Sequence, residues 1–111
     1  MQIIDEGSWM QVVLSGELTM EVIEDLKLEF EEIFERPWQV LAAEVSQVRF
    51  MDSSGIGFLT ALNNRSHQEN RIFCLLSPSQ QVAKTLKLVN LWDLFYTVHS
   101  KEELEERFLS N

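Results

Sequence analysis

Six consecutive residues, Asp52 to Gly57 with the sequence D-S-S-G-I-G, are the first candidates for chemistry in this chain. Asp and Ser are favoured N-cap residues of helices, so one interpretation of the segment is plain helix capping. The other is that a serine accepts a phosphoryl group, because a helix start tolerates phosphate and the added charge of about −1.5 to −2 changes a surface sharply. Gly55 and Gly57 lack side chains and would let another surface approach closely.

The residues on either side predict where this segment lies in the fold. The stretch Trp38–Val45 is nearly all apolar, which is typical of a strand covered on both faces. Gly55–Ser66 has helical spacing, with an apolar side that we expect to face inward. The segment Val48–Leu59 therefore connects a strand to a helix, and in open α/β sheets ligands and partners meet the protein at this edge. The expected inward residues of that helix are Ile56, Leu59 and Leu62 or Asn63.

The remaining elements alternate between strand and helix patterns. We expect strands at Gln2–Asp5, Trp9–Ser15, Ile72–Leu76 and Phe95–Val98, and helices from Thr19 to about Glu35, from Ser79 to Val89 and from Ser100 to Leu109. The order β-β-α-β-α-β-α-β-α predicts an α/β fold: a mostly parallel mixed sheet of about five strands with about four helices, in a single domain spanning 1–111. The first strand is the expected antiparallel exception.

Several finer expectations follow from spacing and from turn chemistry. Asn90 stands where a helix end favours a left-handed residue. Ser100 and Glu103 form the pattern of a capping box. The expected inward residues are Val22, Leu26, Phe30, Ile33 and Phe34 in the first helix, and Val82, Leu86 and Val89 in the third.

Composition excludes several classes of function. The 111 residues carry a formal net charge of −9, which weighs against binding to nucleic acid or to anionic membranes. No apolar run reaches the roughly 20 residues that a membrane helix needs, and the N-terminus has no signal-peptide pattern, so the expected location is the cytoplasm. One cysteine permits neither an intrachain disulfide nor a zinc cluster.

The other chemistry-bearing residues carry weaker signals. His67 and His99 lack partners at metal-ligand spacing, so we expect both to be exposed. Cys74 lies in an apolar strand and is expected to be a buried, inert thiol. Trp92 is either a core residue or an exposed anchor for a partner. The acids of the first helix are expected to form a solvated face, with a basic partner patch as the alternative. They are Glu21, Glu24, Asp25, Glu29, Glu31, Glu32 and Glu35.

Together these segments resemble the anti-sigma factor antagonists of the STAS family. The hallmark of that family is a short hydrophobic stretch followed by D-S-[ST]-G-[LI]-G, which Phe50–Gly57 matches closely. Leu14–Leu18 resembles the family's G-E-L turn, and Leu76–Phe95 its strand–proline–helix segment ending in L-x-x-L-F. Ser100–Glu103 is similar to the start of its last helix, so the resemblance covers nearly the whole chain.

The resemblance implies a regulatory binding protein that is not an enzyme and needs no cofactor or metal. It implies that Ser53 is phosphorylated by an anti-sigma factor that is also a serine kinase, with Ser54 as a capping or packing hydroxyl. The unphosphorylated form would bind the anti-sigma factor and release a sigma factor, and a serine phosphatase would restore it. The implied partner-binding residues are Asp52, Ser53, Ser54, Gly55, Ile56 and Gly57. The alternative is a non-phosphorylated STAS interaction module in a signalling or lipid-transport complex.

Two positions depart from the family pattern. Thr19 follows G-E-L where the family often has Asp, and Glu44 stands for the Asp that often ends the covered strand. We further expect a phosphate on Ser53 to accept backbone N–H bonds at the helix start, with Asp52 and Glu44 opposing it by like-charge repulsion.

Overall fold

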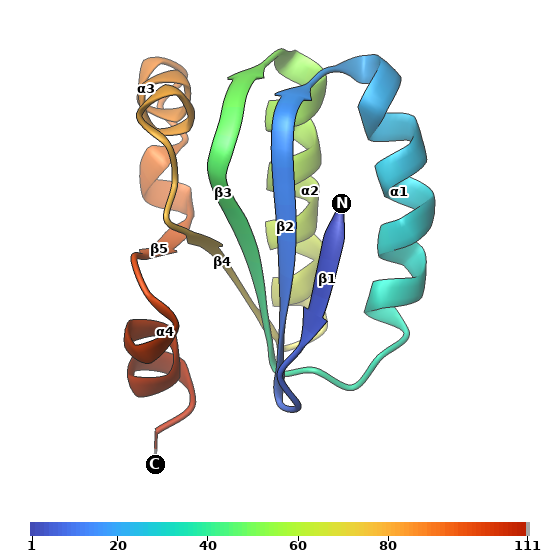
Figure 1. Cartoon of the computed structure of the whole chain (residues 1–111), viewed down its shortest axis with the longest axis vertical. Coiled ribbons are helices and arrows are strands. Elements are labelled where there is room, and N and C mark those ends of the chain that lie inside the picture. Colours follow the sequence, from blue (N-terminus) through green and yellow to red (C-terminus); the bar gives the residue numbers. More distant parts are fainter. Residues whose placement is uncertain (111) are drawn as a thin grey trace.

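The computed structural model describes residues 1–110 and consists of one five-stranded sheet with helices on both faces (Figure 1). The strands lie in the order β1-β2-β3-β4-β5, so strands that are neighbours in sequence are neighbours in space. β1 pairs antiparallel with β2 and the other pairs are parallel, which confirms the expected mixed sheet. The strands are β1 Gln2–Asp5, β2 Trp9–Leu18, β3 Val40–Met51, β4 Ile72–Leu76 and β5 Tyr96–Val98. The helices are α1 Met20–Phe34, α2 Ser53–Gln68, α3 Gln80–Leu88 and α4 Lys101–Phe108, with a 3₁₀ turn at Trp92–Leu94.

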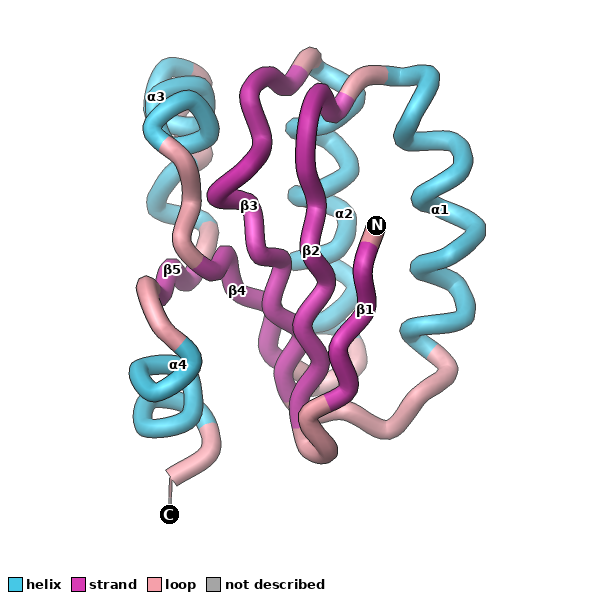
Figure 2. The backbone as a smooth tube through the Cα atoms, in the orientation of Figure 1, coloured by secondary structure: helices cyan, strands magenta, loops and turns pink. Residues whose placement is uncertain are grey.

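The two faces of the sheet have separate cores. The larger core lies under α1, α2 and α3, with inward residues such as Leu41, Ala43 and Val45 from β3. The smaller core lies under α4, where the alternate β3 residues Val40 and Ala42 meet Trp9 and Leu104. Because successive strand residues point to opposite faces, a strand between two cores must be apolar at nearly every position. Figure 2 shows α1 and α2 together on one side of the strands and α4 on the other.

β3 is longer than its apolar stretch predicted. The expected strand ended at Val45, but the observed strand continues to Met51 and includes the first four residues of the segment Val48–Leu59. Two register irregularities with β2, near Val13 and Gly16, let this second half stay paired. Ser79 supports the same region, since its hydroxyl donates to the Val48 carbonyl at 2.8 Å.

The longer strand moves Glu44 away from the candidate site. Glu44 lies in the middle of β3, where its carboxylate accepts from the Ser46 N–H at 2.8 Å. Eight residues of strand at about 3.3 Å each separate it from Asp52 by roughly 25 Å. The expected repulsion between Glu44 and a phosphate on Ser53 is therefore wrong.

The helices follow their predicted patterns with two corrections. In α1 the buried residue of the first turn is Ile23, whereas Val22 is 40% exposed. In α3, Val82 and Leu86 are buried as expected, but Val89 is the C-cap residue and is exposed. The α1 face follows spacings of three and four from Ile23, and Val22 lies about 100° around the helix from that residue.

Two predicted helix ends are confirmed. Asn90 has φ of 59° and adopts the left-handed conformation expected after α3. Ser100 caps α4, where its hydroxyl accepts from the Glu103 N–H at 3.0 Å. Glu103 in turn accepts from the N–H of His99, one residue before the cap. This variant of the capping box satisfies two backbone donors at the start of a short helix.

Candidate functional site

Asp52 lies at the junction where β2 and β3 end and α1 and α2 begin. Its Oδ1 accepts hydrogen bonds from the N–H of Ser54 at 2.9 Å and of Gly55 at 3.1 Å, so Asp52 is the N-cap of α2. Its Oδ2 accepts from the N–H of Met20 at 3.3 Å, at the start of α1. One carboxylate therefore serves the first turns of two helices whose sequences are about thirty residues apart.

This arrangement explains how α1 begins without a capping side chain of its own. Thr19 is the N-cap residue of α1 but forms no side-chain cap hydrogen bond. The Asp52 carboxylate supplies the missing acceptor from the neighbouring strand–helix connection. It also places a negative charge at the positive ends of two helix dipoles, which stabilises both. Thr19, where the family pattern often has a second acid, directly precedes the Met20 N–H that binds this carboxylate.

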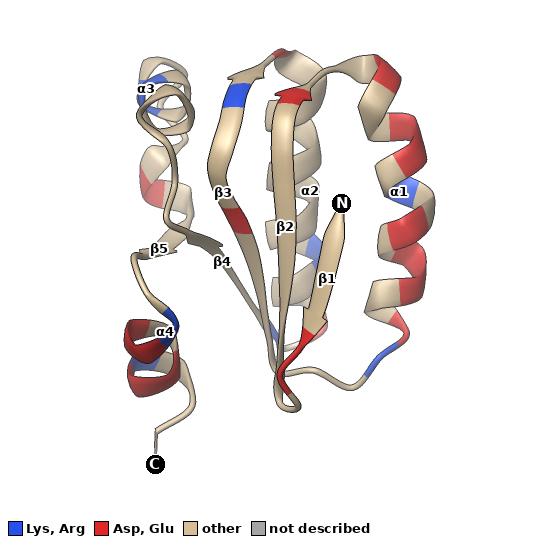
Figure 3. Cartoon of the chain, in the orientation of Figure 1, with Lys and Arg blue, Asp and Glu red and all other residues tan. Residues whose placement is uncertain are grey.

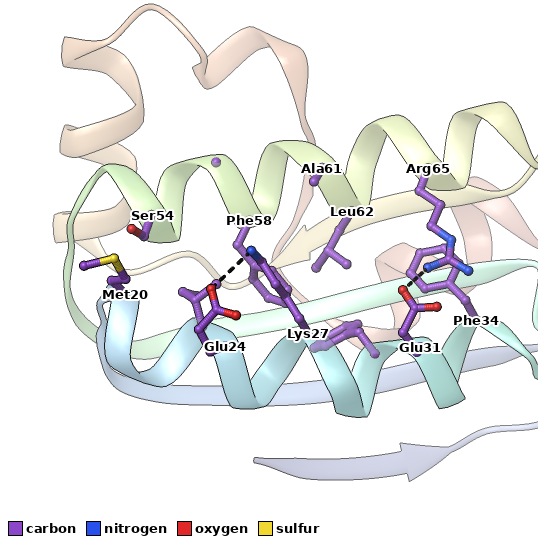
Figure 4. A pocket seen from close by; sticks show the side chains of 13 residues that line it. Met20, Glu24, Lys27, Glu31, Phe34, Ser54, Phe58, Ala61, Leu62 and Arg65 are labelled. Atoms are coloured by element: carbon purple, nitrogen blue, oxygen red, sulfur yellow. Dashed lines mark hydrogen bonds and ion pairs between the residues drawn. The ribbon is translucent and has the colours of Figure 1, made fainter.

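The two serines after Asp52 have different surroundings. Ser53 is the first residue of α2 and is exposed, and capping by Asp52 leaves its hydroxyl without a capping task. Ser54 is half-buried and lies at the mouth of a groove between α1 and α2 (Figure 4). Of the two roles expected for Ser54, capping is performed by Asp52, which accepts from the N–H groups of the first turn, and the half-buried position of Ser54 fits the packing role.

The two glycines also differ, and only one of them faces solvent. Gly55 is buried, and a Cβ at this position would lie 2.5 Å from the Leu18 carbonyl oxygen at the end of β2. The close approach expected at Gly55 is therefore to the chain's own strand. Gly57 is exposed, and a Cβ there would meet no atom within 4 Å. Ile56, between them, is partly buried against the larger core.

Charged residues give the surface around Ser53 a mainly acidic character. Glu17 at the end of β2 and Glu21 in the first turn of α1 are acidic and lie at the same end of the sheet as Asp52. Arg49, near the end of β3, is the nearest basic residue in sequence. Figure 3 shows acidic segments at the C-terminal end of β2 and at the starts of α1 and α2, with a basic band near the end of β3 and an acidic band in the middle of that strand. A phosphoryl group on Ser53 would add negative charge to an already negative surface.

Two exposed hydrophobic residues at this end were not identified by sequence reasoning. Met20, in the first turn of α1, is 64% exposed, and Phe50, near the end of β3, is 46% exposed. Large exposed apolar side chains beside a candidate site are typical of protein interfaces. The sequence contains a hint of this exposure, because neither residue belongs to the pattern of apolar residues that forms the inward face of its helix or strand. The sequence pattern places Phe50 in a connection rather than in a strand, so it does not predict which face the ring occupies.

The remaining candidates have the surroundings expected of them. His67 and His99 are both exposed. Cys74 is buried in β4, and this burial raises the pKa of its thiol to about 12 although the Arg107 charge lowers it, so the thiol stays protonated and inert at neutral pH. Trp92 is partly buried, packs against the larger core and has the Lys87 ammonium 5.1 Å from its ring centroid. Within residues 1–110, no helix is long and apolar enough to cross a bilayer.

Comparisons with known proteins agree with this geometry. A family model of the STAS domain matches residues 2–106. The fold is similar to that of the anti-sigma factor antagonist SpoIIAA in its unphosphorylated form, with TM-score 0.80, 22% identity and coverage of 99% of this chain and 98% of that one. The phosphorylated form of the Bacillus protein gives TM-score 0.72, 22% identity and 96% coverage of each chain.

Two other solved structures share the fold. An anti-sigma factor antagonist from Mycobacterium paratuberculosis gives TM-score 0.83 and 18% identity, covering 98% of this chain and 92% of its own. A sulfate transporter family protein from Wolinella succinogenes gives TM-score 0.76 and 16% identity, covering 92% and 86%. No curated protein matches the chain in sequence.

Proposed function

The chain belongs to the STAS domain family, and from this membership we propose that it is an anti-sigma factor antagonist. In its unphosphorylated form it binds an anti-sigma factor that is also a serine kinase, and a sigma factor is released. Phosphorylation of Ser53 by that kinase ends the binding, and a serine phosphatase restores it. The chain is the substrate and the binding partner in this cycle, and not a catalyst.

The observation that carries the proposal is the division of roles between Asp52 and Ser53. Asp52 caps α2 with its carboxylate, so the exposed Ser53 hydroxyl has no capping task in the fold. A hydroxyl in that position can gain and lose a phosphoryl group while the helix start stays formed. The solved phosphorylated and unphosphorylated forms of SpoIIAA, which share this fold, support the same idea.

We propose that the anti-sigma factor binds across the exposed part of this end of the molecule. Its contacts would include Ser53, Ser54, Ile56 and Gly57 of α2, with Met20 as an apolar neighbour. Asp52 and Gly55 belong to the same segment but act mainly by holding it, because their contacts are to the chain's own backbone. A phosphoryl group at Ser53 would add bulk and charge beside Asp52, and binding would be lost by repulsion and desolvation without refolding.

Phosphorylation with the cognate kinase and ATP, followed by phosphopeptide mapping, tests the modification. We expect the phosphate on Ser53 in the wild type, none in Ser53→Ala, and unchanged labelling in the matched control Ser54→Ala. A kinase of the histidine-kinase ATPase type encoded beside this chain is the enzyme to use. Label on Ser54, or no label with that kinase, would overturn the assignment.

Binding of the anti-sigma factor tests the switch. Ser53→Ala should bind with the affinity of the wild type. Ser53→Asp should bind at least tenfold more weakly, which corresponds to a loss of about 1.4 kcal/mol in binding free energy. Titration calorimetry measures both. Equal affinities of the Ala and Asp variants would contradict a switch at this position.

The alternative is a STAS interaction module that is never phosphorylated, in a signalling or lipid-transport complex. Thr19 is the observation that favours it, because this position carries no acid and Asp52 alone caps the starts of the two helices with a carboxylate. Under this alternative the same end of the molecule would bind a partner constitutively. Lack of labelling together with equal binding by both Ser53 variants would support it.

A further inference from the structure

A groove runs between α1 and α2 on the outer side of these helices (Figure 4). Its volume is about 430 Å³. Its floor is apolar and includes the edge-to-face pair of Phe30 and Phe58, whose ring centroids are 5.2 Å apart. The other apolar side chains that line it are Met20, Ile23, Phe34 and Leu62.

The two rims of the groove differ in chemistry. The α1 rim is charged and carries Glu24, Lys27 and Glu31. The α2 rim has the small residues Gly57 and Ala61, both exposed, and a Cβ at Gly57 would meet no atom within 4 Å. A partner lying in the groove would therefore meet a charged wall on one side and could approach the helix backbone closely on the other.

The groove is long and is closed at one end. Its α2 residues run from Ser54 to Arg65, which corresponds to about 17 Å along the helix axis. At the far end the Arg65 guanidinium lies 4.2 Å from the Phe34 ring centroid and bonds to Glu31 of α1 at 2.9 Å. Burial lowers the pKa of Arg65, but its hydrogen bonds to Glu69 and Glu31 outweigh this and leave the pKa raised. Three turns of a helix fit the open length, with apolar side chains at i, i+4 and i+7 reaching the floor.

The net charge of α1, the helix that forms one wall of the groove, favours a cationic occupant. Within α1 there are six acids and one lysine, a net charge of 1 − 6 = −5, and all seven side chains are exposed. Lys27 pairs with Glu24 at 3.5 Å and Arg65 pairs with Glu31 at 2.9 Å, so the four charged side chains that line the groove cancel. The negative field comes from the other four acids of α1, which lie outside the lining. An anionic ligand would be repelled by this helix, whereas lysine or arginine side chains would be attracted to it.

We propose that this groove binds a basic amphipathic helix of a protein partner. The apolar face of that helix packs on Phe30, Phe58 and Leu62, and its basic residues face α1, whose net charge is −5.

Ser53 does not line the groove, so the switch residue itself makes no contact with the bound helix. The groove shares Met20, Ser54 and Gly57 with the proposed anti-sigma factor surface, so a helix that occupies its whole length would compete with that partner. Variants deeper in the groove and Ser53→Asp separate the test of this inference from the test of the switch.

Fluorescence anisotropy with a labelled model helix tests the proposal on the full chain. The probe is a 14-residue peptide of Leu and Lys with a helical apolar stripe. One control peptide has the same composition in scrambled order, and another has the same pattern with Glu in place of Lys. We expect the patterned basic peptide to bind at least tenfold more tightly than either control.

Two pairs of variants place the binding in the groove. Ala61→Trp fills the groove from an exposed position and should weaken binding at least tenfold, whereas Leu28→Trp, on the exposed outer face of α1, should not. Glu24→Gln should weaken binding two- to fivefold, and the charge-matched Glu29→Gln, outside the groove, should weaken it less than twofold. Ser53→Asp should keep the affinity, which separates this test from that of the switch.

Several outcomes would overturn the proposal. Equal binding of the scrambled peptide, or equal effects of Glu24→Gln and Glu29→Gln, would show general attraction to an acidic protein. A second outcome is that the peptide does not bind, whereas dodecyl maltoside binds tightly below its micellar concentration. If Ala61→Trp then abolished the detergent binding, the groove would be assigned to a small apolar ligand. Dimerisation in sedimentation experiments that Ala61→Trp abolishes would assign it to a second copy of the chain.

Discussion

The two ends of the α1–α2 pair are joined by opposite chemistry. At the N-terminal end, the Asp52 carboxylate accepts from backbone N–H groups of both helices. At the C-terminal end, the Arg71 guanidinium donates to the carbonyls of Phe34 and Arg36 and lies 4.2 Å from the Trp38 ring centroid. Each charge matches the helix dipole that it faces.

The difference between these ends is in what they leave exposed. The arginine end is covered by aromatic rings and ion pairs, so it holds the helices together and offers no obvious acceptor for modification. The carboxylate end uses one small side chain for both helices and leaves Ser53 exposed beside it. A compact capping group therefore makes room for a modifiable residue at a helix start, which a bulky one would cover.

The largest expected effect is at the carboxylate end, at Gly55. Gly55→Ala places a Cβ 2.5 Å from the Leu18 carbonyl oxygen, so β2 and α2 must move apart. We expect a loss of about 3 kcal/mol in the free energy of unfolding. The matched change Gly57→Ala meets open space in a helix interior and should stabilise by up to about 1 kcal/mol. Urea denaturation measures both, and similar losses for the two variants would contradict the packing role of Gly55.

The second prediction concerns the shared carboxylate. Asp52→Ala removes the acceptor of three N–H groups on two helices and should cost about 2–3 kcal/mol, more than the roughly 1 kcal/mol typical of a single cap. Asp52→Asn keeps an oxygen acceptor and should recover about half of that loss. The unfolding free energies of the three proteins give the comparison. A loss near 1 kcal/mol for the Ala variant would show that the bond to Met20 contributes little.

The third prediction concerns the opposite end. Arg71→Ala should lower the free energy of unfolding by about 1–2 kcal/mol, because it removes the two hydrogen bonds to carbonyl groups and the stacking of the guanidinium on Trp38. Arg71→Lys should restore little, because an ammonium cannot reproduce the planar fork of the guanidinium. The rate of Ser53 phosphorylation should be unchanged in both variants. If that rate changed severalfold in a folded Arg71 variant, the two ends would not be independent.

The smallest effect is that of phosphorylation on stability. The Ser54 and Gly55 N–H groups are already bonded to Asp52, so a phosphate on Ser53 cannot accept them without displacing that carboxylate. The expected gain of backbone bonds is therefore not available, while repulsion from Asp52 remains. We expect phosphorylation to lower the free energy of unfolding by no more than about 1 kcal/mol, and this loss should become smaller at high salt. Thermal melts and the near-UV circular dichroism of Trp9, Trp38 and Trp92 would detect a larger loss, which would point to a switch by unfolding.

Sequence patterns predicted the fold more completely than the site. Apolar periodicity and capping residues gave every strand and long helix in the right order, because burial on one or two faces determines those patterns. The errors lie where tertiary contacts decide. Val48 to Met51 pair with β2 through two bulges, and no local pattern distinguishes such a strand from a connection.

The site required distances that sequence spacing does not contain. The motif identified Asp52 and Ser53, but the bond between Asp52 and Met20 joins elements that only the folded sheet brings together. From the sequence, Gly55 is expected to let another surface approach the helix closely. A glycine near a helix start allows close approach either by a partner or by another part of the same chain. The Leu18 carbonyl, fixed by the end of β2, decides between these two.

The shared carboxylate of Asp52 also has a consequence for local opening. Two helix starts that depend on one side chain cannot fray separately, because rotation of that side chain releases Met20, Ser54 and Gly55 at the same moment. Their amide protons should therefore exchange with solvent through one common opening event with one free energy. Ser53 is exposed while this unit is closed, so an enzyme can reach its hydroxyl without opening either helix start.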